Sequence, residues 1–372
     1  MAATIPDWLD PSPWLEWIKR ADRSMVAAAL SAKNPGIREL AVLLSPAAAP
    51  ELETLAQRAR AITQRHFGRV ITLYAPLYLS SRCFSGCVYC GFASNRQTPR
   101  HMLTLEQVDA ELDALKQRGM EEVLLLTGER NPAAGYEYVC DCVERAASRF
   151  STVLVEVFPM SEDEYRGLAT AGCTGITLYQ ETYDPRTYER MHLWGPKRNY
   201  TARLEAPARA LAGGLRIAGL GALLGLSDPF FDMLCLYRHA SYLLRQFWKG
   251  GVALSFPRIR PEAGGFKPPF PVTERLLAQI IFAFRICLPD VPLVLSTRES
   301  PHFRDGMAGV GICKMSAGSR TTVGGYGDSA TSSECQFDVS DGRDVPAFCA
   351  MLRGKGLQPV FKNWDAAYRD AI

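Results

Sequence analysis

Residues 70–92 read VITLYAPLYLSSRCFSGCVYCGF, a nearly unbroken apolar run that passes directly into a loop with three cysteines. Short, continuously apolar runs are typical of parallel strands buried on both faces. The loop places Cys83, Cys87 and Cys90 in the spacing Cys-x3-Cys-x2-Cys. Three thiolates on one short loop can hold three irons of a cubane cluster and leave the fourth iron open. The stretch therefore predicts a buried strand followed by a loop that carries a 4Fe-4S cluster.

The open iron of such a cluster suits S-adenosyl-L-methionine as its ligand. The amino and carboxylate groups of S-adenosylmethionine can chelate the iron, and an electron passed to the sulfonium then releases a 5′-deoxyadenosyl radical. Two other interpretations fit the cysteines less well. A structural zinc site needs four ligands, and no second close Cys or His pair follows. A thioredoxin-like pair of Cys87 and Cys90 would leave Cys83 without a role.

Short apolar runs recur along the rest of the chain and alternate with amphipathic segments, which favours a parallel α/β fold. Capping-box patterns at Thr104-Leu-Glu-Gln107 and Ser161-Glu-Asp-Glu164 mark helix starts. Eight alternations predict a (β/α)8 TIM-type barrel. The eight expected strands are Val70 to Ala75, Glu122 to Leu126, Thr152 to Phe158, Gly175 to Tyr179, Arg216 to Leu220, Gly251 to Phe256, Val291 to Ser296 and Gly311 to Ser316.

The chain divides into three parts in this interpretation. Residues 1–66 form an N-terminal helical extension, with helices over about residues 10–66, and residues 67–330 form the barrel. Residues 331–372 form a C-terminal extension that packs on the barrel. Clusters of Gly, Pro and Ser at Pro257 to Pro271 and Gly318 to Ser333 indicate loops.

The composition of the chain argues against several classes of function. The chain has 372 residues, of which 47% are hydrophobic, and a formal net charge of only +3. No basic tract interleaved with aromatics stands out, so we expect no nucleic-acid partner. No apolar run reaches the length of a membrane span, and no signal peptide is recognisable. Eleven scattered cysteines are typical of reduced thiols. We therefore expect a soluble, cytoplasmic enzyme.

Polar residues at strand ends are the candidate ligands, because a barrel carries its reactive groups at the carboxyl ends of its strands. Thr127-Gly128-Glu129 follows the second expected strand, where Gly128 lets a ligand approach and Glu129 can pair with an amino group such as that of S-adenosylmethionine. An ordinary helix-capping loop with a solvated Glu129 is the alternative. Glu156 lies inside an apolar strand and needs a partner, either a ligand such as the cofactor or an internal salt bridge.

Several longer strings along the chain are specific enough to compare with known families: LYQETY (178–183), HLWGPK (192–197), IAGLGALLGLSD (217–228), SFPRIRP (255–261), STRE (296–299), MSAGS (315–319) and VGGY (323–326). They resemble a known family, the 2-iminoacetate synthases, which are the tyrosine lyases of thiamine thiazole synthesis. The resemblance covers about residues 70–365. It implies a radical S-adenosylmethionine barrel that cleaves the Cα–Cβ bond of L-tyrosine to 2-iminoacetate and p-cresol.

The resemblance also implies roles for single residues. Cys83, Cys87 and Cys90 would ligate the cluster, and Tyr89 would lie near the adenine. Glu129 matches the amino-binding carboxylate, although the family's Gly-Gly-Glu appears here as Thr127-Gly128-Glu129. Arg203 would either hold the carboxylate of S-adenosylmethionine or form a surface salt bridge.

The carboxylate of a tyrosine substrate calls for an arginine fork at a strand end. We expect Arg298, after the seventh strand, to supply it, with Ser316 at the end of the eighth strand as a supporting donor. The arginines of the loop Pro257-Arg258-Ile259-Arg260-Pro261 are expected to brace the barrel mouth instead.

The same resemblance implies protein partners, and it leaves related enzymes as alternative functions. A thiazole synthase would receive the short-lived imine, and a flavodoxin or ferredoxin would supply the electron. A related hydrogenase maturase usually has a further C-terminal domain with its own cluster, for which Cys335 and Cys349 are too far apart. A tryptophan-cleaving relative differs mainly in its pocket. A non-enzymatic zinc or cluster protein would leave the strand-end pattern of Glu129 and Arg298 without an explanation.

Overall fold

The computed structural model describes residues 4–261, 264–327 and 335–362. Its centre is a closed barrel of eight parallel strands, in which β1 pairs with both β2 and β8. This confirms the predicted (β/α)8 class. The barrel strands are β1 (Val70–Tyr78), β2 (Glu122–Leu126), β3 (Thr152–Glu156), β4 (Gly175–Thr177), β5 (Ile217–Gly221), β6 (Gly251–Ser255), β7 (Leu293–Leu295) and β8 (Lys314–Ser316).

The strand ends differ from the predicted ones by a few residues, for local reasons. β7 begins at Leu293 because Pro292 has no N–H to donate. β8 begins at Lys314, after two turns in which Gly309 and Gly311 have positive φ angles of 74° and 96°. β1 runs on to Tyr78 because Ala75–Tyr78 continue to pair with β2. The longer β1 carries the chain directly to the cysteine loop.

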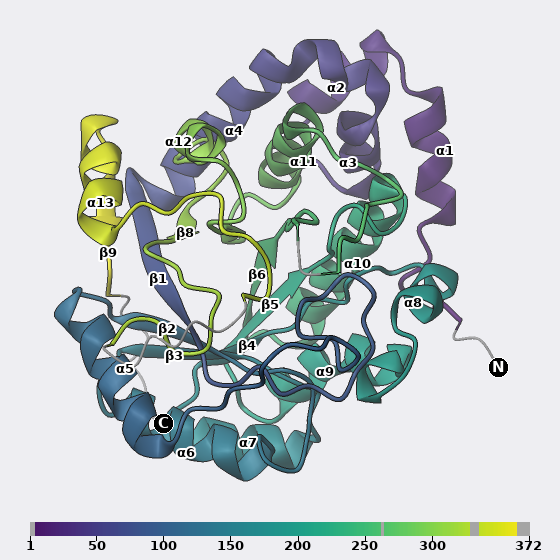
Figure 1. The fold of residues 1–372 in the computed structure, drawn as a ribbon. Coiled ribbons are helices and arrows are strands. Elements are labelled where there is room, and N and C mark those ends of the chain that lie inside the picture. Colours follow the sequence, from purple (N-terminus) through teal and green to yellow (C-terminus); the bar gives the residue numbers. More distant parts are fainter. Residues whose placement is uncertain (1–3, 262–263, 328–334, 363–372) are drawn as a thin grey trace.

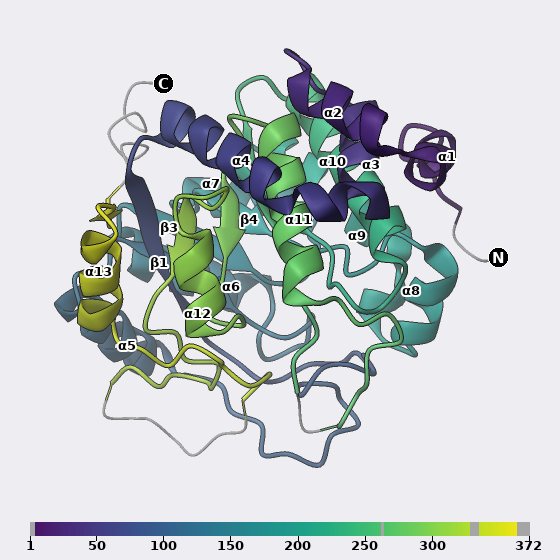
Figure 2. The ribbon, with the colours of Figure 1, turned by 90° about the horizontal axis from the view of Figure 1, so that it is seen from above.

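Helices surround the barrel, and Figure 1 shows the N-terminal helices along one side, next to α10 and α11. Figure 2 shows the same neighbours from above. None of the helices in the described ranges is long and apolar enough to cross a membrane. The helices are α1 (Ser12–Arg20), α2 (Arg23–Ser31), α3 (Ile37–Leu44), η1 (Pro46–Glu51), α4 (Leu52–Phe67), α5 (Leu105–Gln117), α6 (Tyr136–Ala147), α7 (Glu162–Thr170), α8 (Pro185–Met191), η2 (Pro196–Arg198), α9 (Tyr200–Ala212), α10 (Pro229–Gln246), α11 (Glu274–Cys287), α12 (Pro301–Met307) and α13 (Val345–Gly354).

Polar contacts fix the helix ends and the N-terminal layer. Both predicted capping boxes form, at Thr104 with Gln107 and at Ser161 with Glu164. In the layer around α11, the buried amide of Gln279 donates to the carbonyl oxygen of Leu43, at the end of α3, over 2.9 Å. This bond satisfies an otherwise orphaned helix carbonyl and ties α3 to the barrel layer.

The C-terminal segment returns to the barrel at two places. β9 (Gln358–Val360) pairs with the first residues of β1. Asp341 forms an ion pair with Arg304, and both side chains are almost fully buried. Arg304 also donates to the main-chain oxygen of Ser316 at the end of β8. The pair therefore connects the segment after residue 335 to the strand end that faces the site.

Asp341→Ala should destabilise the protein by about 3–5 kcal/mol, because it leaves the Arg304 guanidinium buried without its carboxylate. Chemical denaturation at pH 7 measures the effect. The matched control is Asp163→Ala, which breaks an exposed Arg166–Asp163 pair and should cost less than about 1 kcal/mol. Equal effects of the two substitutions would contradict the prediction.

Candidate active site

The cysteine loop lies at the carboxyl end of β1 and is held by a second segment of the chain. Gly86 donates its N–H to the Trp194 oxygen over 3.1 Å, and the Gly86 oxygen accepts from the Leu193 N–H over 3.0 Å. A Cβ atom at Gly86 would stand only 2.4 Å from the Trp194 ring, so only glycine fits there. The segment 191–195 therefore fixes the path of the loop between its first two cysteines.

All three cysteines line one cavity, which we call the cysteine cavity. Cys83 Sγ accepts from the backbone N–H of Ser85 at 3.5 Å and of Glu129 at 3.3 Å. Cys90 Sγ accepts from the Phe92 N–H at 3.4 Å and from the Gln336 amide at 3.9 Å. Donors of this kind stabilise sulfur ligands and tune the potential of a bound cluster.

The donor set fits an iron–sulfur cluster. Burial raises the pKa of all three thiols, so thiolates are favoured only beside positive charge, which iron supplies. Among the described residues, no three His, Cys, Asp or Glu side chains converge on a single metal ion. A cubane asks for one thiolate per iron, and three thiols around one cavity meet that requirement.

The loop after β2 brings Glu129 to the same cavity. Glu129 Oε1 is buried and has no hydrogen-bond partner among the described residues, which fits a ligand's amino group. Gly128 also lines the cavity, and it has a second role in packing. Its Cβ would stand 2.3 Å from the Arg82 oxygen, so glycine is needed for packing against the cysteine loop. This close packing aligns the carboxylate with the cysteines.

Two acidic and two basic side chains are buried together in the cysteine cavity. Arg203, on α9, lies 3.6 Å from the carboxylates of both Glu129 and Glu181, and its Nε donates to the Tyr179 oxygen over 2.7 Å. Lys197 donates to Glu181 over 2.6 Å. Arg203 is only 7% exposed, so it is an internal residue and not a surface salt-bridge residue. The charges of the four side chains cancel.

Tyr89 reaches the cysteine cavity from between Cys87 and Cys90. Its hydroxyl is 2.7 Å from Nε2 of His192, and the other ring nitrogen of His192 contacts the Tyr188 oxygen at 2.8 Å. Burial lowers the pKa of His192 to about 3, so this histidine is neutral at ordinary pH. The hydrogen bonds fix the orientation of the Tyr89 ring at the cavity wall.

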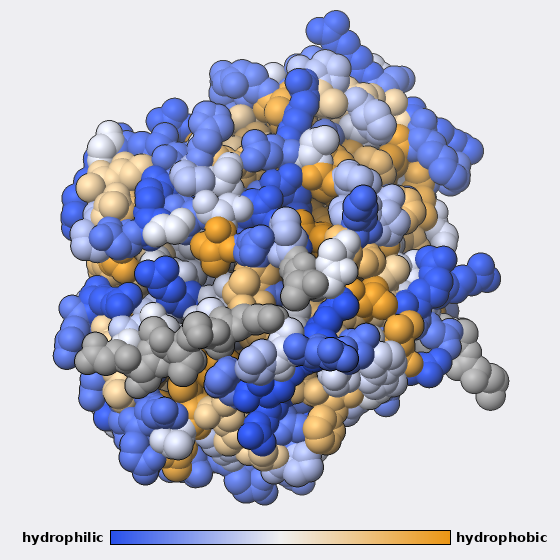
Figure 3. Space-filling model, viewed as in Figure 1, coloured by the Kyte–Doolittle hydropathy of each residue, from blue (hydrophilic) through white to orange (hydrophobic). Residues whose placement is uncertain are grey.

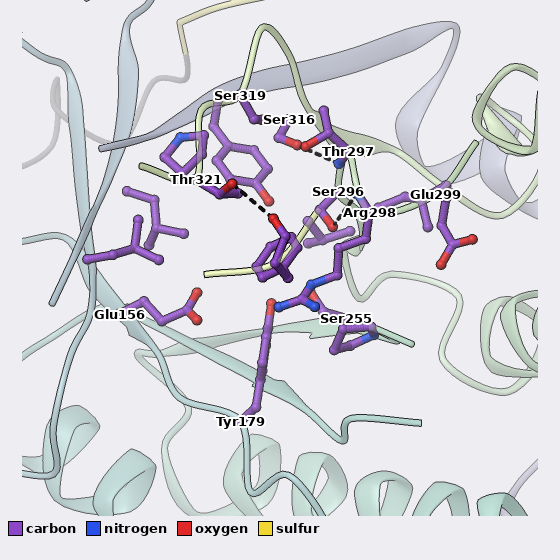
Figure 4. Close-up of a pocket in the computed structure, with 18 of the residues that line it drawn as sticks. Glu156, Tyr179, Ser255, Ser296, Thr297, Arg298, Glu299, Ser316, Ser319 and Thr321 are labelled. Atoms are coloured by element: carbon purple, nitrogen blue, oxygen red, sulfur yellow. Dashed lines mark hydrogen bonds between the residues drawn. The ribbon is translucent and has the colours of Figure 1, made fainter. Parts of the chain in front are cut away.

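A second cavity, which we call the inner cavity, adjoins the first one. Tyr78, Glu156, Tyr179, Arg298 and Phe337 line both. Figure 4 shows the Arg298 guanidinium reaching into the inner cavity near Glu156, with the hydroxyl end of Tyr179 directed toward it. The guanidinium also stacks on Phe337, 3.4 Å from the ring centroid. Arg298 is thus a cation at the junction of two cavities.

The strand ends beneath Arg298 are tied together. Ser316 Oγ, at the end of β8, accepts from the Thr297 N–H over 3.1 Å (Figure 4). Arg258 forms an ion pair with Glu299, and Arg260 donates to the Arg298 main-chain oxygen. These contacts confirm that the two loop arginines brace the barrel mouth.

Glu156 ends β3 and lines both cavities. Figure 4 shows its side chain in the inner cavity. Burial raises its pKa to about 7, while Arg298 acts in the opposite direction. The carboxyl is therefore divided between its neutral and charged forms near neutral pH. The charge of a ligand in the cavity can decide between the two forms.

The stability of the protein should depend on pH through Glu156. A carboxyl whose pKa rises from 4.5 to about 7 on folding stabilises the fold at low pH and loses that contribution as pH rises through 7. The free energy of unfolding of Glu156→Gln, relative to the wild type, should therefore increase by about 2 kcal/mol between pH 5 and pH 8. Denaturation of both proteins over this range measures the difference, and parallel curves would contradict the assignment.

Comparison with known proteins identifies the family. The chain is 41% identical over 342 residues to 2-iminoacetate synthase from Escherichia coli (strain K12), covering 92% of this chain and 90% of the relative. The chain belongs to the 2-iminoacetate synthase family. Residues 77–230 match the Radical SAM superfamily, and residues 255–358 match the Biotin and Thiamin Synthesis associated domain.

Solved structures share the fold of this 2-iminoacetate synthase family member. A crystal structure of HydG, a maturase of the FeFe-hydrogenase, matches with a TM-score of 0.91 at 30% identity, covering 98% of this chain and 83% of that chain. Methylornithine synthase matches with a TM-score of 0.73 at 20% identity, covering 93% and 99%. The predicted barrel, the radical S-adenosylmethionine lyase class and the cluster and S-adenosylmethionine as cofactors are confirmed.

The two cavities bring together every site residue predicted from the sequence. The cysteine cavity is lined by Cys83, Cys87, Tyr89, Cys90, Glu129, Glu156, Arg203 and Arg298, and the inner cavity by Glu156, Arg298 and Ser316. Sequence reasoning missed Glu181, Lys197, Gln336 and Phe337. Glu181 and Lys197 do occur in strings shared with the 2-iminoacetate synthases, which was the available signal.

Proposed function

We propose that this protein is a 2-iminoacetate synthase that cleaves the Cα–Cβ bond of L-tyrosine to 2-iminoacetate and p-cresol for thiazole formation in thiamine biosynthesis. S-adenosylmethionine is converted to 5′-deoxyadenosine and methionine in the same reaction. One observation carries the proposal: the Arg298 guanidinium stands where the inner cavity meets the cavity that holds the cysteines. An amino acid bound there by its carboxylate lies next to the cofactor site.

Residue roles at the cofactor site follow from chemistry. We assign Cys83, Cys87 and Cys90 to the cluster and Glu129, with its unpartnered oxygen, to the amino group of S-adenosylmethionine. Arg203 holds Glu129 in place and is our candidate for the carboxylate of S-adenosylmethionine. Tyr89 is assigned to the adenine.

The barrel supplies positioning and shelter for the reaction. When bound, the cluster and S-adenosylmethionine supply the radical that takes hydrogen from the tyrosine amino group. Arg298 holds the tyrosine carboxylate, and Ser316 fixes the strand ends beneath it. Glu156, which faces both cavities, is our candidate for an amino group of either ligand. The cavity walls keep water from the hydrolysable imine.

Domain division and protein partners are part of the same proposal. Residues 1–66 are a helical extension, 67–330 the catalytic barrel and 331–372 a C-terminal extension. A thiazole synthase takes over the imine, since free imine hydrolyses in water. A flavodoxin or ferredoxin provides the electron.

An anaerobic assay tests the proposal. The iron-reconstituted protein is incubated with S-adenosylmethionine, dithionite and either tyrosine or tryptophan, and products are identified by mass spectrometry. We expect 5′-deoxyadenosine, p-cresol and glyoxylate, the hydrolysis product of the imine, from tyrosine alone. An aromatic product from tryptophan instead would overturn the substrate, and cleavage of neither amino acid would overturn the lyase.

A further inference from the structure

Three large hydrophobic side chains are exposed together beside the cysteine loop. Phe84, Leu193 and Trp194 are 54%, 44% and 40% exposed, and they make up half of the large exposed hydrophobic residues in the described ranges. Figure 1 shows the cysteine loop on the front face, and in Figure 3 hydrophobic side chains interrupt the hydrophilic surface of that face. Grouped apolar residues at a surface mark an interaction site more often than scattered ones do. Because two of these three residues are aromatic, we call them together the aromatic patch.

The aromatic patch is built on the backbone that carries the cysteines. Phe84 directly follows Cys83, and the Leu193 and Trp194 backbone is hydrogen-bonded to Gly86 in both directions. The Trp194 ring lies against Gly86, and its indole N–H donates to Ser94 over 2.8 Å. The aromatic patch thus lies partly on the loop that holds Cys83 and Cys87 and partly on the segment hydrogen-bonded to it.

The surroundings of the patch are basic. Residues 82–100 contain three arginines and neither Asp nor Glu. Residues 186–198 contain Arg186, Arg190, Lys197 and Arg198 against one acid, Glu189. Arg82, Arg186, Arg190 and Arg198 are exposed. Lys197 is paired with buried Glu181, so it does not add to the surface charge. The four exposed arginines against the single acid Glu189 leave a surplus of three positive charges, so the surface around the patch attracts an acidic partner.

We propose that the aromatic patch and its arginine rim are the docking surface for an acidic flavodoxin that reduces the cluster. The inference rests on the proposed radical enzyme. One electron leaves the reduced flavin, which is oxidised by one electron, and enters the cluster held by the cysteines beneath the patch. An apolar centre suits a flavin because the exposed edge of its ring is itself apolar and aromatic, and Trp, Phe and Arg are frequent in interface centres.

The surface predicts a transient complex. Electron-transfer partners bury small interfaces and rely on charge for fast association. Flavodoxin affinity should therefore fall as ionic strength rises from low to physiological values. A purely apolar contact would be less sensitive to salt.

Leu193→Glu tests the proposal because it places a carboxylate in the centre of the patch and repels an acidic partner. The matched control is Trp248→Glu, an 83% exposed residue between α10 and β6, at the opposite end of the barrel. Calorimetry on the reconstituted protein without S-adenosylmethionine or tyrosine should show flavodoxin binding weakened at least tenfold in Leu193→Glu and unchanged in Trp248→Glu. Cluster bleaching by reduced flavodoxin should slow by a similar factor, whereas bleaching by dithionite should not change.

The other outcomes each overturn the proposal. These are unchanged flavodoxin binding in Leu193→Glu, an equal loss in both variants, or binding of a ferredoxin but not of flavodoxin. A concentration-dependent dimer that Leu193→Glu dissociates without changing flavodoxin affinity would reassign the patch to a second copy of the chain. Failure of the proposed function is distinguishable, because flavodoxin would then still bleach the cluster while no p-cresol forms.

Discussion

Arg298→Ala is expected to weaken tyrosine binding at least about 30-fold, because truncating one partner of a buried charge pair costs about 2–5 kcal/mol. The guanidinium is the cation that faces the inner cavity, and the substrate carboxylate would lose its two-pronged partner. Arg298→Lys keeps the charge but loses the fork, so its loss should be smaller. The tyrosine affinities of the wild type and of the two variants are measured by equilibrium binding to the reconstituted proteins in the presence of S-adenosylmethionine.

Folding should survive the loss of this guanidinium. The backbone at residue 298 is fixed by its N–H to Ser296 and by the Arg260 side chain on its oxygen. Burial raises the pKa of Glu156 and Arg298 opposes that rise, so removal of Arg298 leaves a neutral carboxyl rather than an unpaired charge. Binding of S-adenosylmethionine, measured in parallel, should change little. Wild-type affinity for tyrosine in Arg298→Ala would refute the assignment of this residue.

The barrel could be predicted from the sequence because its strands are buried on both faces. The residues of Glu122–Leu126 are all buried, and those after Glu122 form a continuous apolar stretch, so this strand was predicted with its observed bounds. The boundaries were less predictable where turn chemistry decides them. Pro292 and the positive-φ glycines Gly309 and Gly311 shortened β7 and β8 to three residues each.

The site could be predicted where residues stand at strand ends. Cys83, Glu129, Glu156 and Arg298 follow or end strands whose carboxyl ends meet at one rim, so topology alone brings them together. Gln336 and Phe337 reach the cavities from a C-terminal segment with no period in its sequence. Its position depends on long-range bonds such as that from Gln336 N–H to the Thr321 oxygen at 3.1 Å, which a pattern of residue types does not encode.

Four charged side chains are buried together in the cysteine cavity, and Arg203 is the one that lies near both carboxylates, those of Glu129 and Glu181. The loss of Arg203 should therefore have a large effect on the stability of the protein. Burial lowers the pKa of Arg203, but Glu129 and Glu181 more than offset this effect. Burial likewise raises the pKa of Glu181, and Lys197 and Arg203 reverse it, so the carboxylate stays charged. Without Arg203, Lys197 alone faces two carboxylates. Glu181 keeps its direct hydrogen bond to Lys197 at 2.6 Å, whereas Glu129 loses its ion pair.

Arg203→Met should therefore cost about 3–5 kcal/mol of the free energy of unfolding at pH 7, as expected when one partner of a buried ion pair is removed. The double variant Glu129→Gln/Arg203→Met restores a neutral set, with Lys197 and Glu181 as its only charged pair, and should be more stable than Arg203→Met alone. Anaerobic denaturation of the wild type, both single variants and the double variant gives the coupling energy between the two residues. Strictly additive losses would show that the two side chains do not interact. Binding of S-adenosylmethionine to the same variants separates the effect on stability from the effect on ligand contact. Glu129→Gln has an amide in place of the carboxylate, so it should bind the cofactor weakly even where its fold is intact. The double variant should not recover that affinity.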